Sequence, residues 1–337
     1  MTYLPPAAPH LGAVIGCTPL VRLPYLSKRT GLNVWAKLEG FNPGGSAKDR
    51  TAAALVEDAY SSGRLRPGGT VVESSSGNLG MALARECCRR GMSFHCVVDP
   101  RTNRYAVSVM EALGATVHRV TAPDPVTGDW LAARRNRVRD LLEELPGSVN
   151  LDQYSNRAVF PAHAQGTMLE IVEQLGHAPA HLFAAVSTTG TLGGCLDYLR
   201  GARAATRVTA VDATGSVLYG GCRGERPLPG FGAGVVPELS TRSRPHAVAR
   251  IDAARAVAGA RLVARREAYL PGASGGAVVA ALLDAAATGA PGGHDPEPHN
   301  DAVLIFHDHG YAYLDTVYSD AWVREHLGDP SELENTL

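Results

Sequence analysis

The sequence predicts an α/β protein assembled from parallel βαβ units. Three observations support this class. The chain has 337 residues, more than one hydrophobic core usually organises, so two lobes or a single large α/β unit are expected. Short apolar or β-branched runs alternate with longer stretches of helical spacing from residue 33 onward. Turn-rich segments separate the two kinds of run, as in parallel sheets whose strands are joined by helices.

In the first half of the chain, residues 33–38 predict a strand, and residues 48–62 predict a helix that stops before Gly63. Strands at 70–73, 93–98 and 115–120 are short runs with β-branched or aromatic members. The helices between and after them are predicted from apolar spacing at 81–90, 105–113 and 130–145. The alternation predicts a parallel sheet in this half.

In the second half, helices are expected at 164–175, 192–200 and 276–287, and strands at 182–186, 208–212 and 302–306. Residues 215–237 are rich in Gly and Pro and predict a long ordered loop near a functional site. Residues 289–300 predict a mobile surface connection.

Composition excludes several classes of partner. The formal net charge is −1, which gives no reason to expect nucleic acid or an anionic membrane as partner. No apolar run is long enough to span a bilayer, and the first residues, MTYLPPAAPH, do not form a signal peptide. The six cysteines form no CxxC pair or regular framework. We therefore expect a cytoplasmic protein.

A lysine opens the first long helix. Lys48 lies in Asn-Pro-Gly-Gly-Ser-Ala-Lys-Asp-Arg, residues 42–50, at the end of a turn-rich segment. The positive end of a helix dipole disfavours an ammonium there, and a neutral amine is what imine chemistry requires. Taken alone, the same pattern fits a solvated lysine in a first helical turn.

Residues 74–80, Ser-Ser-Ser-Gly-Asn-Leu-Gly, form another strand–loop–helix junction. Hydroxyls and free backbone N–H groups at a helix start can bind a carboxylate. The Asn78 amide can hydrogen-bond a phenolic oxygen. A simple N-cap with a glycine turn explains this segment equally well.

Two further junctions carry small polar residues. Residues 187–191, Ser-Thr-Thr-Gly-Thr, follow an apolar strand and could cradle a phosphate at a helix start. No lysine follows the glycine, so this is not a Walker A loop, and no strand is followed by GxGxxG. In residues 272–276, Gly-Ala-Ser-Gly-Gly, the Ser274 hydroxyl could face a pyridine nitrogen, although helix capping is an alternative.

Together, the order and spacing of these four motifs resemble fold-type II pyridoxal-phosphate (PLP) enzymes of the cysteine synthase and cystathionine β-synthase group. The resemblance covers nearly the whole chain. It implies two lobes, each with a mostly parallel twisted sheet flanked by helices: a large PLP-binding domain of residues 1–44 and 151–337 and a smaller mobile domain of residues 45–150. It also implies a homodimer.

The resemblance assigns a role to each motif. Lys48 is expected to form the Schiff base with PLP, and Asn78 to contact the O3′ oxygen of the cofactor. Ser274 is expected to face the pyridine nitrogen. The phosphate cradle and the substrate-binding residues comprise Ser187, Thr188, Thr189, Gly190 and Thr191 for the phosphate, and Ser75, Ser76, Gly77 and Gln153 for the substrate carboxylate.

This residue set suits replacement of a β-substituent. PLP acts as an electron sink, and Lys48 is the natural base for the Cα proton. A neutral serine at the pyridine nitrogen favours elimination and replacement over transamination. The expected enzyme is therefore a PLP-dependent transferase acting on a serine-derived amino acid.

Departures from the usual cysteine synthase pattern indicate a subgroup. Leu79 stands where threonine is usual, and Ser187 and Thr189 replace glycines. Residues 211–217 and 313–320 also depart from that pattern. These features resemble the N-(2-amino-2-carboxyethyl)-L-glutamate synthases of siderophore and 2,3-diaminopropionate biosynthesis. The resemblance implies O-phospho-L-serine as donor and L-glutamate as nucleophile.

A phosphorylated donor calls for a cation, and Arg134 is the candidate by its position in the resembling segment. The alternative for Arg134 is the solvated face of a basic helix. The nearest alternative function is a cysteine synthase, that is, an O-acetylserine or O-phosphoserine sulfhydrylase. A threonine dehydratase, a haem- or CBS-domain-bearing synthase and a catalytically inactive PLP-binding partner fit the residues less well.

Residues 307–309, His-Asp-His, could suggest a metal site. Two histidines at i and i+2 without a third ligand are weak evidence, and the segment follows an apolar strand where the family has a loop near the cofactor ring. We therefore predict no metal.

Overall fold

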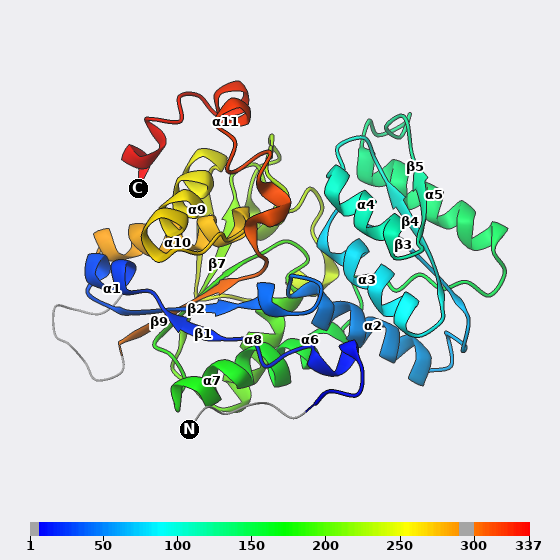
Figure 1. Ribbon diagram of the computed structural model, residues 1–337, viewed down its shortest axis with the longest axis horizontal. Helices are drawn as coiled ribbons and strands as arrows, with labels where there is room; N and C mark the ends of the chain where they lie inside the picture. Colours follow the sequence, from blue (N-terminus) through cyan, green and yellow to red (C-terminus); the bar gives the residue numbers. More distant parts are fainter. Residues whose placement is uncertain (1–6, 290–299) are drawn as a thin grey trace.

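The computed structural model describes residues 7–289 and 300–337 and contains two sheets (Figure 1). The larger sheet has six strands in the order β1-β2-β9-β6-β7-β8. Only the β1–β2 pair is antiparallel in this sheet. Its strands are β1 (Leu20–Arg22), β2 (Asn33–Leu38), β6 (His181–Ala185), β7 (Arg207–Ala213), β8 (Ala247–Ile251) and β9 (Asp301–Phe306).

The smaller sheet has three parallel strands in the order β3-β4-β5. They are β3 (Thr70–Ser74), β4 (Ser93–Val98) and β5 (Thr116–Arg119). The predicted class, a fold-type II architecture with two mostly parallel sheets flanked by helices, is confirmed. The two sheets lie on either side of the predicted boundaries at residues 44 and 150, and the exact division into domains stays a prediction.

The larger sheet is covered on both faces because its strands are apolar on both sides. Along β9, Leu304 and Phe306 pack toward one core, and Val303 and Ile305 pack toward another. This follows from the two-residue period of a strand. The first core includes α9 (Ala253–Glu267) and α10 (Ala273–Ala287); the second includes α7 (Leu169–Leu175) and α8 (Gly190–Gly201).

Helices α9 and α10 approach each other closely through glycines. A Cβ at Gly259 or Gly276 would collide with the backbone of the other helix. The remaining helices of this part of the chain are α1 (Pro24–Thr30), α6 (Val159–Ala162), a π-turn (His163–Met168) that joins α6 to α7, and α11 (Asp320–His326).

Helices also cover both faces of the smaller sheet. One face packs on α2 (Lys48–Ser61), α3 (Asn78–Arg89) and α4 (Arg104–Ala112). The other face, through Val72 and Val97, packs on α5 (Trp130–Glu144). Figure 1 shows α5 at the outer side of this sheet. Among the described residues, no helix is long and apolar enough to cross a membrane.

Most predicted elements are present, and several limits need correction. The helix predicted at 81–90 begins at Asn78, the helix predicted at 192–200 begins at Gly190, and the helix predicted at 276–287 begins at Ala273. The helical segment predicted at 164–175 begins earlier, at Val159. Pro161 is compatible with this start because it lies in the first turn, where the backbone N–H makes no intrahelical hydrogen bond. Elements β1, α1, β8, α9 and α11 were not predicted. The connection predicted at 289–300 lies outside the described residues, apart from its two ends.

Candidate active site

A cavity of about 180 Å³ is lined from both sheets and holds all the residues that the sequence assigned to the site. Lys48, Ser75, Ser76, Gly77 and Asn78 reach it from the starts of α2 and α3, and Arg134 reaches it from α5. Gln153 reaches it from the connection between α5 and α6, and the larger sheet and its helices contribute Ser274 and the loop of residues 187–191. Pro229 and Gly230 also line the cavity, so the loop predicted at 215–237 does reach the site.

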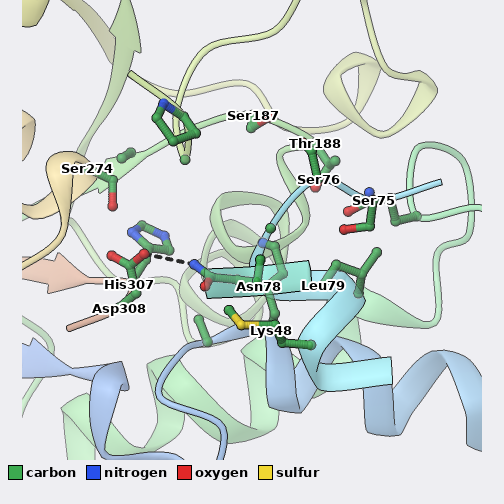
Figure 2. A pocket seen from close by; sticks show the side chains of 18 of the residues that line it. Lys48, Ser75, Ser76, Asn78, Leu79, Ser187, Thr188, Ser274, His307 and Asp308 are labelled. Carbon is green, nitrogen blue, oxygen red and sulfur yellow. Dashed lines mark hydrogen bonds between the residues drawn. The ribbon is translucent and has the colours of Figure 1, made fainter. Parts of the chain in front are cut away.

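Lys48 is the first residue of α2 and projects into this cavity (Figure 2). Desolvation lowers the pKa of its amine, and the charge of Asp308 opposes that shift. Gly45 lets the chain turn just before the helix, since it has a φ of 80° and a Cβ there would collide with His309. The site thus contains a desolvated amine that gives up its proton more readily than a surface lysine.

A network of buried charged side chains anchors α2 through Arg50. Arg50 donates from Nε to Glu39 Oε2 (2.8 Å) and from Nη1 to Glu170 Oε1 (2.7 Å). Lys37, fully buried in β2, lies 2.8 Å from Glu170 Oε2. This network was not predicted, although a lysine inside an apolar strand such as residues 33–38 was a signal for it. It ties the helix that carries Lys48 to β2 and α7.

The predicted phosphate cradle is a strained loop at the start of α8. Thr189 has a φ of 67°, the left-handed region that a β-branched residue rarely adopts. Its hydroxyl is buried and has no hydrogen-bond partner. Such strain persists only where surrounding structure enforces it, and it gathers at ligand sites. The loop therefore presents an unpaired hydroxyl at a helix N-terminus, which suits an anion.

A buried histidine, which the sequence analysis did not identify, supports the cradle. His163 Nε2 lies 3.3 Å from Thr191 Oγ1, and its Nδ1 lies 3.0 Å from Thr167 Oγ1. Desolvation lowers the pKa of His163 well below its usual value, so the ring is neutral. The contact of Thr167 Oγ1 with Glu39 Oε1 (3.4 Å) connects the cradle to the charge network behind Lys48.

The loop before α3 is organised by its own side chains. Ser75 Oγ accepts a hydrogen bond from the Gly80 N–H at 2.8 Å. Asn78 Nδ2 donates to Asp308 Oδ2 at 2.8 Å, as the dashed line in Figure 2 shows. Ser76 and Gly77 line the cavity beside them. The start of α3 thus faces the cavity with free backbone donors, an arrangement that can bind a carboxylate.

Arg134 is buried in α5 and is not on a solvated face, with 9% of its surface exposed. Its side chain lines the cavity together with Tyr154, which the sequence analysis did not identify although it follows Gln153. Burial raises the pKa of the Tyr154 phenol, while Arg134 and Arg135 act in the opposite direction. This wall of the cavity carries the Arg134 guanidinium, a group that can bind a phosphate.

The segment after β9, expected to form a loop near the cofactor ring, contributes residues to which no role was assigned. His307 and Asp308 line the cavity, and both ring nitrogens of His307 are buried without a hydrogen-bond partner. Desolvation and the nearby Lys48 lower the pKa of His307 to about 3, so it is neutral. Within residues 7–289 and 300–337, no cluster of three or more His, Cys, Asp or Glu side chains could hold a metal ion.

A family model described as "Pyridoxal-phosphate dependent enzyme" matches residues 12–306. The chain belongs to this family. The predicted family and cofactor are thereby confirmed. PLP supplies the electron sink for reactions at the Cα and Cβ of an amino acid when it is bound.

Named relatives narrow the comparison. Two proteins called N-(2-amino-2-carboxyethyl)-L-glutamate synthase, from Cupriavidus metallidurans and Ralstonia nicotianae, are each 41% identical to this chain. Each match covers 92% of this chain and 89% of the relative. The resemblance to this subgroup, inferred from the residues, is confirmed.

Solved structures of PLP-family enzymes share the fold. The crystal structure of an O-ureido-L-serine synthase matches with a TM-score of 0.83 and 30% identity, covering 96% of both chains. An O-acetylserine-dependent cystathionine β-synthase from Helicobacter pylori matches with a TM-score of 0.82 and 26% identity, covering 93% of this chain and 99% of that one.

The residues of this PLP enzyme fit the cofactor. The unpaired Thr189 hydroxyl and the start of α8 suit its phosphate, and the desolvated Lys48 amine suits its aldehyde. Ser274, 2% exposed at the start of α10, supplies a hydroxyl from another wall of the same cavity. These individual contacts with PLP remain predictions.

Proposed function

We propose that this PLP enzyme is a β-replacement synthase that joins O-phospho-L-serine to L-glutamate. The products are N-(2-amino-2-carboxyethyl)-L-glutamate and inorganic phosphate, and the role is in 2,3-diaminopropionate biosynthesis, including that of siderophores. The observation that carries the proposal is the 41% identity, over 92% of this chain, to two enzymes named for that product.

The donor is proposed to bind between the two sheets. Its carboxylate is held by Ser75, Ser76 and the start of α3, with Gln153 nearby, and its phosphate lies against Arg134. Support for the second contact comes from the burial of Arg134 and from the cavity that it lines. A guanidinium can bind two phosphate oxygens at once, which an ammonium cannot do with the same geometry.

Lys48 is proposed to move the protons. Its amine takes the proton from Cα of the donor, and the Cβ–O bond breaks with its electron pair leaving on phosphate. The amine of glutamate then forms a bond to Cβ, its surplus proton passes to the released phosphate, and Lys48 returns its proton to Cα. The lowered pKa of Lys48 supports this role, since an amine must be neutral to act as a base.

The test is a mass-spectrometric assay of PLP-loaded protein with O-phospho-L-serine, offering L-glutamate and sulfide separately. A glutamate adduct with stoichiometric phosphate release, absent in Lys48→Ala, would support the proposal. Cysteine formed from sulfide, with no glutamate adduct, would replace it with a cysteine synthase. Absorbance of bound PLP that does not respond to the donor would indicate a catalytically inactive binder.

Two further properties are proposed from the family resemblance. The chain is a cytoplasmic homodimer, and its smaller domain, residues 45–150, moves as a unit to close on the substrate. Sedimentation analysis of the purified protein tests whether it is a homodimer. Scattering measurements with and without the donor test the second, because closure reduces the radius of gyration.

A further inference from the structure

Residues 307–309 lie where three loops of the site meet. The Ala47 N–H, one residue before Lys48, donates to the His307 carbonyl at 2.8 Å. The Gly272 N–H, two residues before Ser274, donates to the Asp308 carbonyl at 3.2 Å. The Asn78 side chain reaches the Asp308 carboxylate from the third loop. A change in this segment therefore affects several proposed cofactor contacts.

The Asp308 carboxylate is buried, with 3% of the residue exposed. Its Oδ2 accepts from Asn78 Nδ2 at 2.8 Å and from the Tyr313 hydroxyl at 2.6 Å. A Cβ at Gly272 would collide with Oδ1, so the backbone of residue 272 lies directly against that oxygen. The carboxylate is thus confined between two donors and a close backbone, which gives it one orientation.

A carboxylate acceptor determines the orientation of the amide beside it. The oxygen and nitrogen of an asparagine side chain exchange places by a half-turn of the amide. Asp308 Oδ2 accepts two hydrogen bonds, and only the nitrogen of Asn78 can donate one. The nitrogen has a second N–H, for which a ligand competes with the neighbouring Tyr313 hydroxyl. The hydrogen bond also connects the two parts of the chain, since Asp308 follows β9 of the larger sheet and Asn78 begins α3, which packs on the smaller sheet.

We propose that Asp308 is a positioning residue that holds the Asn78 amide with its nitrogen toward the phenolic oxygen of PLP. This inference rests on the proposed contact between Asn78 and the cofactor. It does not depend on the identity of the donor or of the nucleophile. Because the hydrogen bond joins the two sheets, the amide is oriented only while α3 is docked against the end of β9.

The test uses the full-length chain and its apoprotein, with three readouts: the dissociation constant for PLP, the absorption spectrum of the bound cofactor and the melting temperature of the apoprotein. Asp308→Ala is expected to weaken PLP binding about tenfold and to change the spectrum as Asn78→Ala does. The double variant is expected to be no weaker than either single variant, since both remove one coupled interaction.

Two matched variants separate positioning from simple stability. Asp308→Asn keeps an acceptor oxygen and is expected to recover most of the wild-type spectrum. Tyr313→Phe removes the other donor but leaves Asp308 bonded to Asn78, and its spectrum is expected to change less than that of Asp308→Ala. If Asp308→Ala does not fold, Asp308→Ser replaces it, because a serine hydroxyl is too short to reach the Asn78 amide.

Each contrary outcome has a distinct meaning. A lower apoprotein melting temperature with an unchanged cofactor spectrum would make Asp308 a purely structural residue. Additive losses in the double variant would show that Asp308 does not act through Asn78. An unchanged spectrum in Asn78→Ala would remove the proposed cofactor contact and this inference with it, while the β-replacement activity would be judged separately by the product assay.

Discussion

The Nε atom of Arg134 lies 3.3 Å from Oδ2 of Asp99, but no hydrogen bond joins the two. Asp99 is instead bonded by Arg101, whose Nη2 donates to the same oxygen at 2.8 Å. Asp99 thus forms an ion pair with Arg134 in the wall of the cavity, but the Nε of Arg134 has no hydrogen-bond partner. A buried guanidinium with an unpaired donor is costly unless a ligand completes its bonding.

The first prediction concerns the donor. Arg134→Ala is expected to lower kcat/KM for O-phospho-L-serine by about ten- to hundredfold, because a charge-assisted contact to phosphate is lost. Arg134→Lys is expected to recover only part of the loss, since an ammonium lacks the planar pair of donors. Steady-state kinetics with O-acetyl-L-serine as a neutral donor provides the control. Equal losses with both donors would show that Arg134 does not read the phosphate.

The second prediction identifies the lysine that binds the cofactor. Borohydride reduction of the PLP-loaded protein, followed by peptide mass spectrometry, is expected to find the reduced cofactor on the peptide containing Lys48 and on no peptide of Lys48→Ala. The physical reason is that the desolvated Lys48 amine has a lowered pKa and lies in the cavity. Labelling of another lysine in the wild-type protein would contradict the assignment.

The third prediction concerns the strained cradle. Thr189→Val preserves the shape of the side chain and removes a buried hydroxyl that has no partner in the apoprotein. The apoprotein is expected to be more stable by about 1 kcal/mol, while PLP binding becomes several-fold weaker. Urea unfolding and equilibrium dialysis measure the two effects. Unchanged PLP affinity would exclude a contact between this hydroxyl and the cofactor phosphate.

The fourth prediction concerns pH. Desolvation raises the pKa of Glu170, but hydrogen bonds and charges from Arg50 and Lys37 outweigh it and hold the pKa at about 2, against an ordinary 4.5. A lowered folded-state pKa contributes stability above the unfolded value, and that contribution is lost as pH falls toward the folded value. Solvent screening reduces this contribution, which is at most about 3 kcal/mol and is present at neutral pH.

Urea unfolding of the wild type and of Glu170→Gln at pH 6 and at about pH 3.5 tests the sign. The difference in unfolding free energy is expected to narrow by about 1 kcal/mol at the lower pH, because Glu170 is then mostly protonated in the unfolded chain but still ionised in the folded protein. A difference that stays constant or widens on acidification would show that Glu170 is not held ionised by Arg50 and Lys37.

Residues close together in the chain determined much of this protein. The strands at 33–38 and 93–98 were predicted with their exact bounds. Each is an apolar or β-branched run, and the residues next to it in the chain favour a turn. The loops around Lys48, Asn78, Ser187 and Ser274 were predicted for the same reason, since each is a turn with its own polar residues that leads into a helix. The order of those motifs then indicated the family, which the comparisons confirmed.

Tertiary contacts decided the rest. Helix α9 was not predicted, although its Asp252 N-cap is a local signal; its close approach to α10 through Gly259 and Gly276 is a tertiary feature. The His-Asp-His segment was predicted to bind no metal but was given no other role, and the folded chain brings Asp308 to Asn78, 230 residues away, and to Tyr313. Local sequence specifies backbone preference and periodicity over a few residues. Which buried charge meets which donor is set only when both sheets have formed and water has been excluded from between them.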